Sequence, residues 1–132
     1  MPLLNFKRQF VEPIRSGRKH HTIRTTRKIP IKPGDKLYLY CGLRQKGAFR
    51  ILPEPQVCTR VLPIHIDSVL RDVHVNRRIE ERPFFRVILD GILLGKDECE
   101  TLAVADGFTN FAEMMKFWTG RLPFDGHIIH WR

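Results

Sequence analysis

The stretch that connects a short predicted helix to the strand after it reads Gly17-Arg18-Lys19-His20-His21-Thr22-Ile23-Arg24. Residues 12–16 favour one or two helical turns, with Pro13 in the first turn and Gly17 in the left-handed position that closes the helix. Residues 22–26 are rich in β-branched side chains and predict a strand. Lys19 is therefore expected just beyond the helix end, where a turn of the chain can bring its amine close to the Thr22 hydroxyl.

The rest of the chain predicts several short strands and few helices. Strands are expected at residues 3–6, 36–41, 57–66, 84–89, 92–94 and 127–131, and helices at 97–105 and after the capping pair Asn110 and Glu113. Residues 42–55 read as a loop excursion, and no element is assigned to residues 72–83. Because there is no βαβ rhythm, the pattern predicts an α+β domain built round a small, mostly antiparallel β-barrel with two or three short helices.

Length and composition limit the class of protein. The 132 residues, 42% of them hydrophobic, suit a single domain over 1–132. No apolar run approaches the roughly 18–20 residues of a membrane-spanning helix, and the N-terminus lacks the apolar core of a signal peptide, so a cytoplasmic protein without a membrane partner is expected. Cys41, Cys58 and Cys99 are odd in number and form no CxxC pair, which favours reduced thiols over a cysteine-based zinc site.

The positive charge is concentrated in the first half of the chain. Residues 1–60 hold 14 Lys/Arg against 3 Asp/Glu, a net +11, which leaves −2 for the rest of a chain whose formal charge is +9. Such a concentration attracts polyanions, so RNA or a nucleoside or nucleotide ligand is the expected partner; the alternative is that the basic residues merely solvate strands. No GxxxxGK[ST] loop is present, which argues against chemistry driven by ATP or GTP.

Three side chains could form a reactive group. A threonine hydroxyl becomes a nucleophile when a neutral lysine takes its proton, and Lys19 and Thr22 supply these two parts. Asp106, in Asp106-Gly107-Phe108 at the expected helix exit, could orient Lys19 or act on a leaving group. The alternative is a structural ion pair between Lys19 and Asp106, with Thr22 an ordinary strand residue. Tyr38, Tyr40, Phe108 and Trp131 are candidate walls for a flat ligand.

Several motifs along the chain are shared with one known family: Phe10, Ile14, Gly17-Arg18-Lys19, Thr22-Ile23-Arg24, Pro33-Gly34-Asp35, Asp106-Gly107-Phe108, Glu113-Met114 and a C-terminal apolar strand. This combination resembles the ASCH (activating signal cointegrator homology) domain family, whose fold resembles the PUA barrel of RNA-modifying enzymes. The resemblance runs from Leu3 to Trp131, apart from residues 43–56 and 72–100. It implies an RNA-related module in which Lys19, Arg24 and, less directly, Arg18 meet phosphate or base.

The same resemblance implies an alternative function. Some small bacterial members of the family are amidohydrolases that deacetylate N4-acetylcytidine with a lysine, a threonine and a distant glutamate. Lys19 and Thr22 match the first two, and Asp106 falls where the glutamate would fall but is one methylene shorter. A displacement of about 1 Å in a catalytic group can cost on the order of a hundredfold in rate, so binding is the first hypothesis and hydrolysis the second. A ribonuclease is a third possibility.

The histidines form no chelating pair within either strand. His20 and His21 are adjacent, and His127 and His130 are three apart, so on a strand the members of each pair point to opposite faces. No metal and no cofactor are therefore expected. His20 or His21 could instead line the cleft and change its charge near neutral pH.

Overall fold

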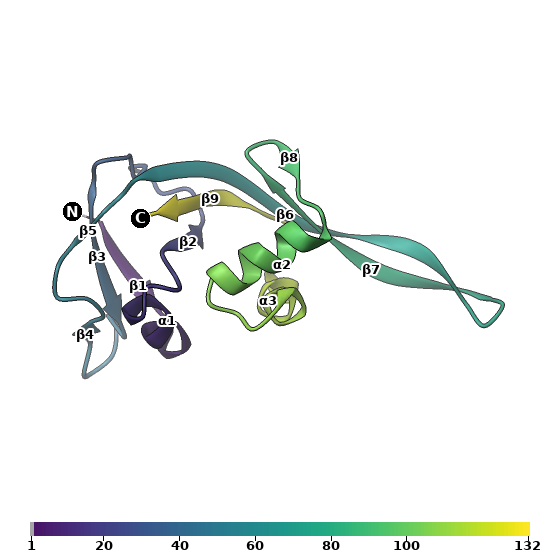
Figure 1. Cartoon of the computed structure of the whole chain (residues 1–132), viewed down its shortest axis with the longest axis horizontal. Coiled ribbons are helices and arrows are strands. Elements are labelled where there is room, and N and C mark those ends of the chain that lie inside the picture. Colours follow the sequence, from purple (N-terminus) through teal and green to yellow (C-terminus); the bar gives the residue numbers. More distant parts are fainter. Residues whose placement is uncertain (1) are drawn as a thin grey trace.

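A computed structural model describes residues 2–132 and contains two β-sheets and three short α-helices (Figure 1). The first sheet consists of β1 (Leu3–Phe6), β3 (Lys36–Cys41), β4 (Phe49–Arg50) and β5 (Gln56–Val57). β1 runs parallel to β3, whereas β4 and β5 pair with β3 in the antiparallel direction. β3 alternates as its sequence predicts, with Leu37 and Leu39 buried and the tyrosines between and after them half-buried.

The second sheet is entirely antiparallel and has the order β2-β9-β6-β7-β8. Its strands are β2 (His21–Arg24), β9 (Phe124–His130), β6 (Arg60–Val75), β7 (Arg78–Leu89) and β8 (Ile92–Leu93). The α+β class and the mostly antiparallel pairing are thus confirmed. Residues 2–132 do not form the closed barrel that was expected, because the edge strands β2 and β8 pair with no strand of the first sheet.

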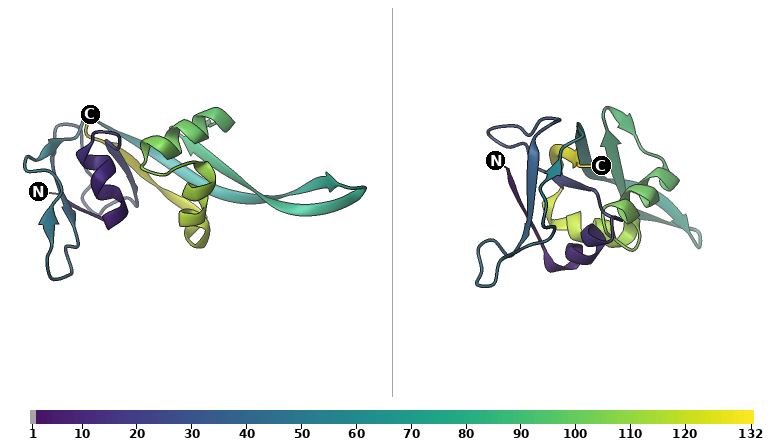
Figure 2. Two further views of the ribbon diagram at one scale, coloured as in Figure 1. Left: turned by 60° about the horizontal axis from the view of Figure 1, so that its bottom comes forward. Right: turned by 60° about the vertical axis from the view of Figure 1, so that its left-hand side comes forward.

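A long hairpin extends from the second sheet. β9 pairs with β6 as far as Ile66, opposite Phe124, whereas the pairing of β6 with β7 continues to Val75 and Arg78. Residues 67–86 therefore form a two-stranded arm that projects away from the helices (Figures 1 and 2). The arm includes residues 72–83, to which the sequence analysis assigned no element. Its turn residues have positive φ angles of 50° and 63°.

The helices contribute buried side chains to the core. α1 (Val11–Arg15) follows the 3-10 turn η1 (Arg8–Phe10), and α2 (Lys96–Ala105) precedes α3 (Phe111–Trp118) and the 3-10 turn η2 (Thr119–Arg121). As predicted, Asn110 caps α3, and its side chain accepts a hydrogen bond of 2.8 Å from the Glu113 amide. Met114, Met115 and Trp118 are buried in the core on the predicted apolar face.

Two further observations bear on the expected class of protein. All three cysteines are buried and free. Within residues 2–132, no helix has the length and apolar character needed to cross a membrane.

Candidate functional site

Lys19 enters the interior of the protein immediately after α1. Gly17 has a φ of +82°, which reverses the chain at the helix end, and the Lys19 amide donates a hydrogen bond of 2.9 Å to the carbonyl of Pro13. The chain then continues into β2. This turn directs the Lys19 side chain inward, where the residue is only 2% exposed.

Asp106 meets Lys19 from the other side of the site. It terminates α2, and the Lys19 Nζ donates hydrogen bonds to its Oδ1 atom at 2.6 Å and to its backbone carbonyl at 2.7 Å. The approach requires Gly107, whose φ is +98°. A Cβ atom there would lie 3.0 Å from Phe10 Cδ1 and 3.3 Å from Lys19 Cδ. The shorter acid at position 106 therefore still reaches the lysine.

Burial and pairing act against each other in this contact. Burial is the largest influence on Lys19 and lowers the pKa of its amine, although the contacts with Asp106 raise it. Burial also disfavours the ionised Asp106, but the Lys19 charge and the contact with His21 outweigh it and hold the pKa of the carboxyl below its usual range. The pairing thus favours the ionised form of Asp106, whereas burial makes Lys19 release its proton more readily than an exposed lysine.

Lys19, Thr22 and Asp106 line one cavity of about 440 Å³, which is hereafter called the basic cavity. Arg24 also lines it, and its Nε donates a hydrogen bond of 3.3 Å to the Thr22 hydroxyl oxygen. Burial and the nearby charge of Arg27 lower the pKa of Arg24 to about 10, so that the guanidinium is still charged at neutral pH. The Thr22 hydroxyl proton is not used in the contact with Arg24, because the hydroxyl accepts there.

Aromatic rings form most of the apolar wall of the basic cavity: Phe6, Phe10, Phe108, Phe117, Trp118 and Phe124. Of the four walls proposed from the sequence, only Phe108 is among them. Two exposed cations, Lys7 and Arg121, also line the cavity, and both lie over the ring of Phe117, at 4.9 and 4.2 Å from its centroid. Phe6 and Phe10 could have been suspected, since both come shortly before the predicted first helix at residues 12–16.

Arg18 is not part of the basic cavity. Its side chain is 62% exposed and pairs with Glu12 on the outer side of α1. The segment 17–24 therefore divides its cations between two environments. Lys19 and Arg24 face the cavity, whereas Arg18 faces solvent.

The histidines are arranged differently from the expectation. β2 pairs with β9 so that His21 lies opposite His130, and His20 precedes the strand. These three residues form a cluster whose potential ligand atoms lie within 4.8 Å of one another. The spacing of histidines within each segment does not reveal this cluster, because it depends on the cross-strand pairing that brings the segments together. Burial, with the neighbouring cations, lowers the pKa of His130 to about 4.

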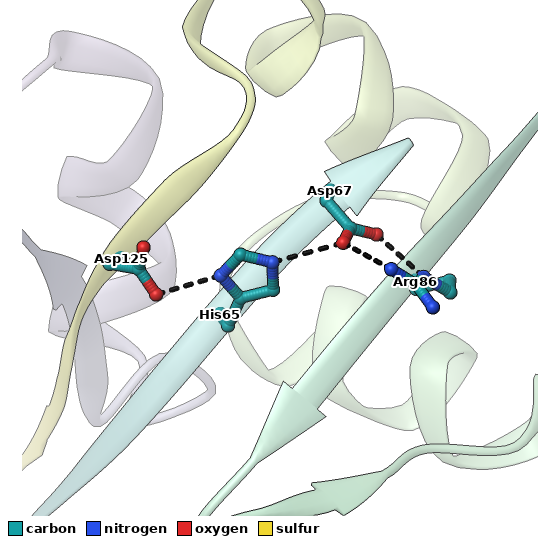
Figure 3. A network of polar contacts seen from close by, with 4 residues as sticks. All are labelled: His65, Asp67, Arg86 and Asp125. Carbon is teal, nitrogen blue, oxygen red and sulfur yellow. Dashed lines mark hydrogen bonds and ion pairs between the residues drawn. The ribbon is translucent and has the colours of Figure 1, made fainter. Parts of the chain in front are cut away.

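A second polar network lies at the base of the arm (Figure 3). His65 Nδ1 is 2.7 Å from an Asp125 oxygen, and its Nε2 is 3.0 Å from Asp67. Arg86 donates two hydrogen bonds to the Asp67 carboxylate. Asp67 and Arg86 form the first cross-strand pair beyond the end of β9, so the network marks where the arm leaves the sheet.

Comparisons of the chain with protein-family models, with curated proteins and with solved structures found no match.

Proposed function

We propose that the chain is an ASCH-type module with a PUA-like fold that binds RNA or a modified nucleotide, with one unstacked base held in the basic cavity. A single observation supports this most strongly: a cavity walled by six aromatic rings is also lined by four cations and one carboxylate. Its volume of about 440 Å³ is in the range of sites for small ligands. Aromatic walls suit the flat face of a base, and basic groups suit the phosphate beside it.

The cations of the cavity have different roles in this proposal. The charge of Lys19 is already neutralised by Asp106, so this pair is suited to hydrogen bonding with the edge of a base. Arg24 has no carboxylate partner among the described residues, and Lys7 and Arg121 are exposed beside Phe117. These three unpaired cations are therefore the groups that would meet phosphate.

Arg24 and Arg18 provide a matched test of this proposal. Both belong to the segment 17–24, and replacing either with Met removes one positive charge, but only Arg24 lines the cavity. We expect Arg24→Met to weaken the binding of a short single-stranded RNA by about tenfold or more, the loss of a charge-assisted hydrogen bond, and Arg18→Met to have little effect. Binding is measured by fluorescence anisotropy at several salt concentrations, and wild-type affinity should fall as salt rises. Equal losses in the two variants, or no RNA binding by the wild type, would refute the proposal.

The alternative function is deacylation of N4-acetylcytidine or a related nucleoside. It is favoured by one observation, the presence of Lys19, Thr22 and Asp106 around the same cavity. In this reaction the Thr22 oxygen attacks the acyl carbon, its proton passes to a neutral Lys19, and the released amine of the base takes a proton back from that lysine. Water then hydrolyses the threonine ester to give acetate.

Chromatography distinguishes hydrolysis from binding. The wild type should convert N4-acetylcytidine to cytidine and acetate, and Thr22→Val, which keeps the shape of the side chain and removes the hydroxyl, should not. RNA binding without any turnover by the wild type would reject the hydrolase and leave the binding module. Turnover that persists in Thr22→Val would reject the threonine nucleophile.

A further inference from the structure

The histidine cluster of His20, His21 and His130 lies outside the proposed RNA-binding function. Pairing of β2 with β9 sets His21 against His130, with ring centroids 5.2 Å apart, and the His20 ring is 6.0 Å from that of His21. Each side chain can offer one nitrogen to a common point, since the three potential ligand atoms lie within 4.8 Å of one another.

The cluster contains polar atoms that the protein itself does not satisfy. His20 Nδ1 and His130 Nε2 are buried and have no hydrogen-bond partner in the described part of the chain, whereas the buried His21 Nε2 lies 3.2 Å from Asp106 Oδ1. His21 is the most enclosed of the three, with 3% of its surface exposed. A buried polar atom without a partner costs free energy, and two of them in one side-chain cluster are unusual in a protein interior. A ligand that binds these nitrogens would remove this cost.

The cluster also opens onto a cavity of its own. All three histidines line a space of about 450 Å³, which is also lined by Asp97, Glu98 and Thr101 of α2. A cation bound by the histidines would therefore have a free coordination position on the cavity side, with two acidic residues nearby. The Asp106 carboxylate, 3.2 Å from His21 Nε2, supplies a further negative charge next to the cluster.

We propose that His20, His21 and His130 bind a divalent transition metal ion of the zinc class, with the fourth coordination position facing the α2 cavity. Imidazole nitrogen is a preferred ligand of zinc, and three protein ligands with one open position are typical of its accessible sites. A tetrahedral zinc with Zn–N bonds of about 2.0–2.1 Å needs its nitrogens about 3.3 Å apart. The potential ligand atoms of the three histidines lie within 4.8 Å of one another. Zinc binding would therefore shorten each distance between them by at most about 1.5 Å.

The alternative explanation is that the three histidine rings pack against one another as neutral aromatic groups, without a metal ion. That arrangement accounts for the edge-to-face geometry of the His20 and His21 rings, which are inclined at 89°. It does not account for the buried nitrogens of His20 and His130 being left without partners within the same cluster. The metal site explains both why the three histidines converge and why these two nitrogens have no protein partner.

Titration of the full-length chain, freed of metal with a chelator, tests the proposal with Zn²⁺ alone as the probe. We expect one Zn²⁺ per chain by calorimetry, and Co²⁺ in its place should give the intense visible absorption of a tetrahedral nitrogen site. Zn²⁺ should also raise the melting temperature, because it binds the folded state.

Three variants locate the site. His20→Ala and His130→Asn should each weaken Zn²⁺ binding by more than about a hundredfold, since even the loss of an outer-shell partner costs 10–100-fold. His74→Ala, which removes an exposed histidine of the arm, should bind as the wild type does. His20 precedes β2, so His20→Ala keeps the test valid if His130→Asn does not fold. Absence of stoichiometric Zn²⁺ binding by the wild type, or unchanged binding in His20→Ala, would overturn the proposal.

The metal site and the basic cavity can be separated experimentally. Arg24 lines the basic cavity but not the α2 cavity, so Arg24→Met should leave Zn²⁺ affinity unchanged. Failure of RNA binding therefore leaves the metal site untouched, and failure of Zn²⁺ binding leaves the RNA proposal untouched.

Discussion

Two networks in this protein use the same chemistry in opposite surroundings. In one, Asp106 lies between Lys19 and His21, whose side chains are 2% and 3% exposed. In the other, hereafter called the exposed network, His65 lies between Asp67 and Asp125, and Arg86 contacts Asp67 (Figure 3); the exposed fractions of these side chains are 31%, 15%, 83% and 37%. Each network contains a histidine, a carboxylate and a cation. They differ chiefly in how much water reaches them.

That difference determines what each network can do. Water and salt screen the charges of the exposed network, so its pairs add little to stability and can exchange partners. The buried network cannot be screened, so its charges must stay paired with each other or be compensated by a ligand. A buried network beside a cavity is therefore suited to recognition, and an exposed network at the base of the arm is suited to holding two strands in register.

The largest expected effect comes from breaking the buried pair. Lys19→Met leaves the Asp106 carboxylate buried without its main partner, and we expect the free energy of unfolding to fall by about 3–5 kcal/mol. Urea denaturation measures the change. The double variant Lys19→Met/Asp106→Leu removes both charges and should recover much of the loss. A single variant as stable as the wild type would show that the pair is not desolvated as described.

A smaller effect should come from the backbone that brings Asp106 to Lys19. Gly107→Ala and Gly34→Ala are matched, because the two glycines have φ angles of +98° and +94°. A Cβ atom at Gly34 meets nothing within 4 Å, whereas one at Gly107 meets Phe10 at 3.0 Å. We expect Gly34→Ala to cost about 1–2 kcal/mol from the left-handed backbone, and Gly107→Ala about 1 kcal/mol more from crowding.

Both glycine variants are to be measured by the same urea denaturation. The difference between them isolates the close approach of Gly107 to Phe10 and Lys19. Equal losses would mean that the site has room at this turn, and the tight packing of the buried network would then have to be rejected.

The exposed network should respond to salt where the buried one does not. Asp67→Asn removes the charge that Arg86 and His65 contact, and we expect a loss of stability much smaller than that of Lys19→Met. The loss should shrink as NaCl is raised, because the charges are screened. Denaturation in low and high salt checks this. A loss that is independent of salt would show that Asp67 acts by packing.

The positions of Lys19 and Asp106 are predicted better from the sequence than the aromatic walls of the cavity are. Gly17 and the helix end before it place Lys19, and the predicted helix at 97–105 places Asp106 at its exit, because these features depend on local backbone preferences. The aromatic walls Phe117 and Phe124 depend on how distant elements pack, so local patterns do not reveal them.

Two other features could not be derived from local patterns. In the arm, residues 78–82 carry charged side chains on both faces, since neither face packs on the core, and this part of the arm therefore lacks the alternation that marks a strand with one buried face. The histidine cluster depends on pairing between β2 and β9, which are more than a hundred residues apart along the chain. The pairing partner of a strand is a long-range property that a single sequence does not specify.

The smallest expected effect is the dependence of the exposed network on pH. Two carboxylates contact the two ring nitrogens of His65, which requires both nitrogens to donate, and the hydrogen bonds to Asp125 and then Asp67 raise the pKa of His65 above 6.5. A raised histidine pKa gives stability that is complete below 6.5 and is lost as pH rises through the folded-state pKa. Arg86, followed by His65, lowers the pKa of Asp67 from 3.8 to about 2, so the stability that Asp67 contributes is lost as pH falls from 3.8 through 2.

The destabilisation caused by His65→Gln should therefore be greatest between about pH 4 and pH 6.5 and should disappear at pH 9. Urea denaturation of the wild type and of His65→Gln across pH measures it. Lys19→Met leaves the His65 network intact and should not show this pH profile, and a parallel loss in both variants would contradict the distinction between the two networks.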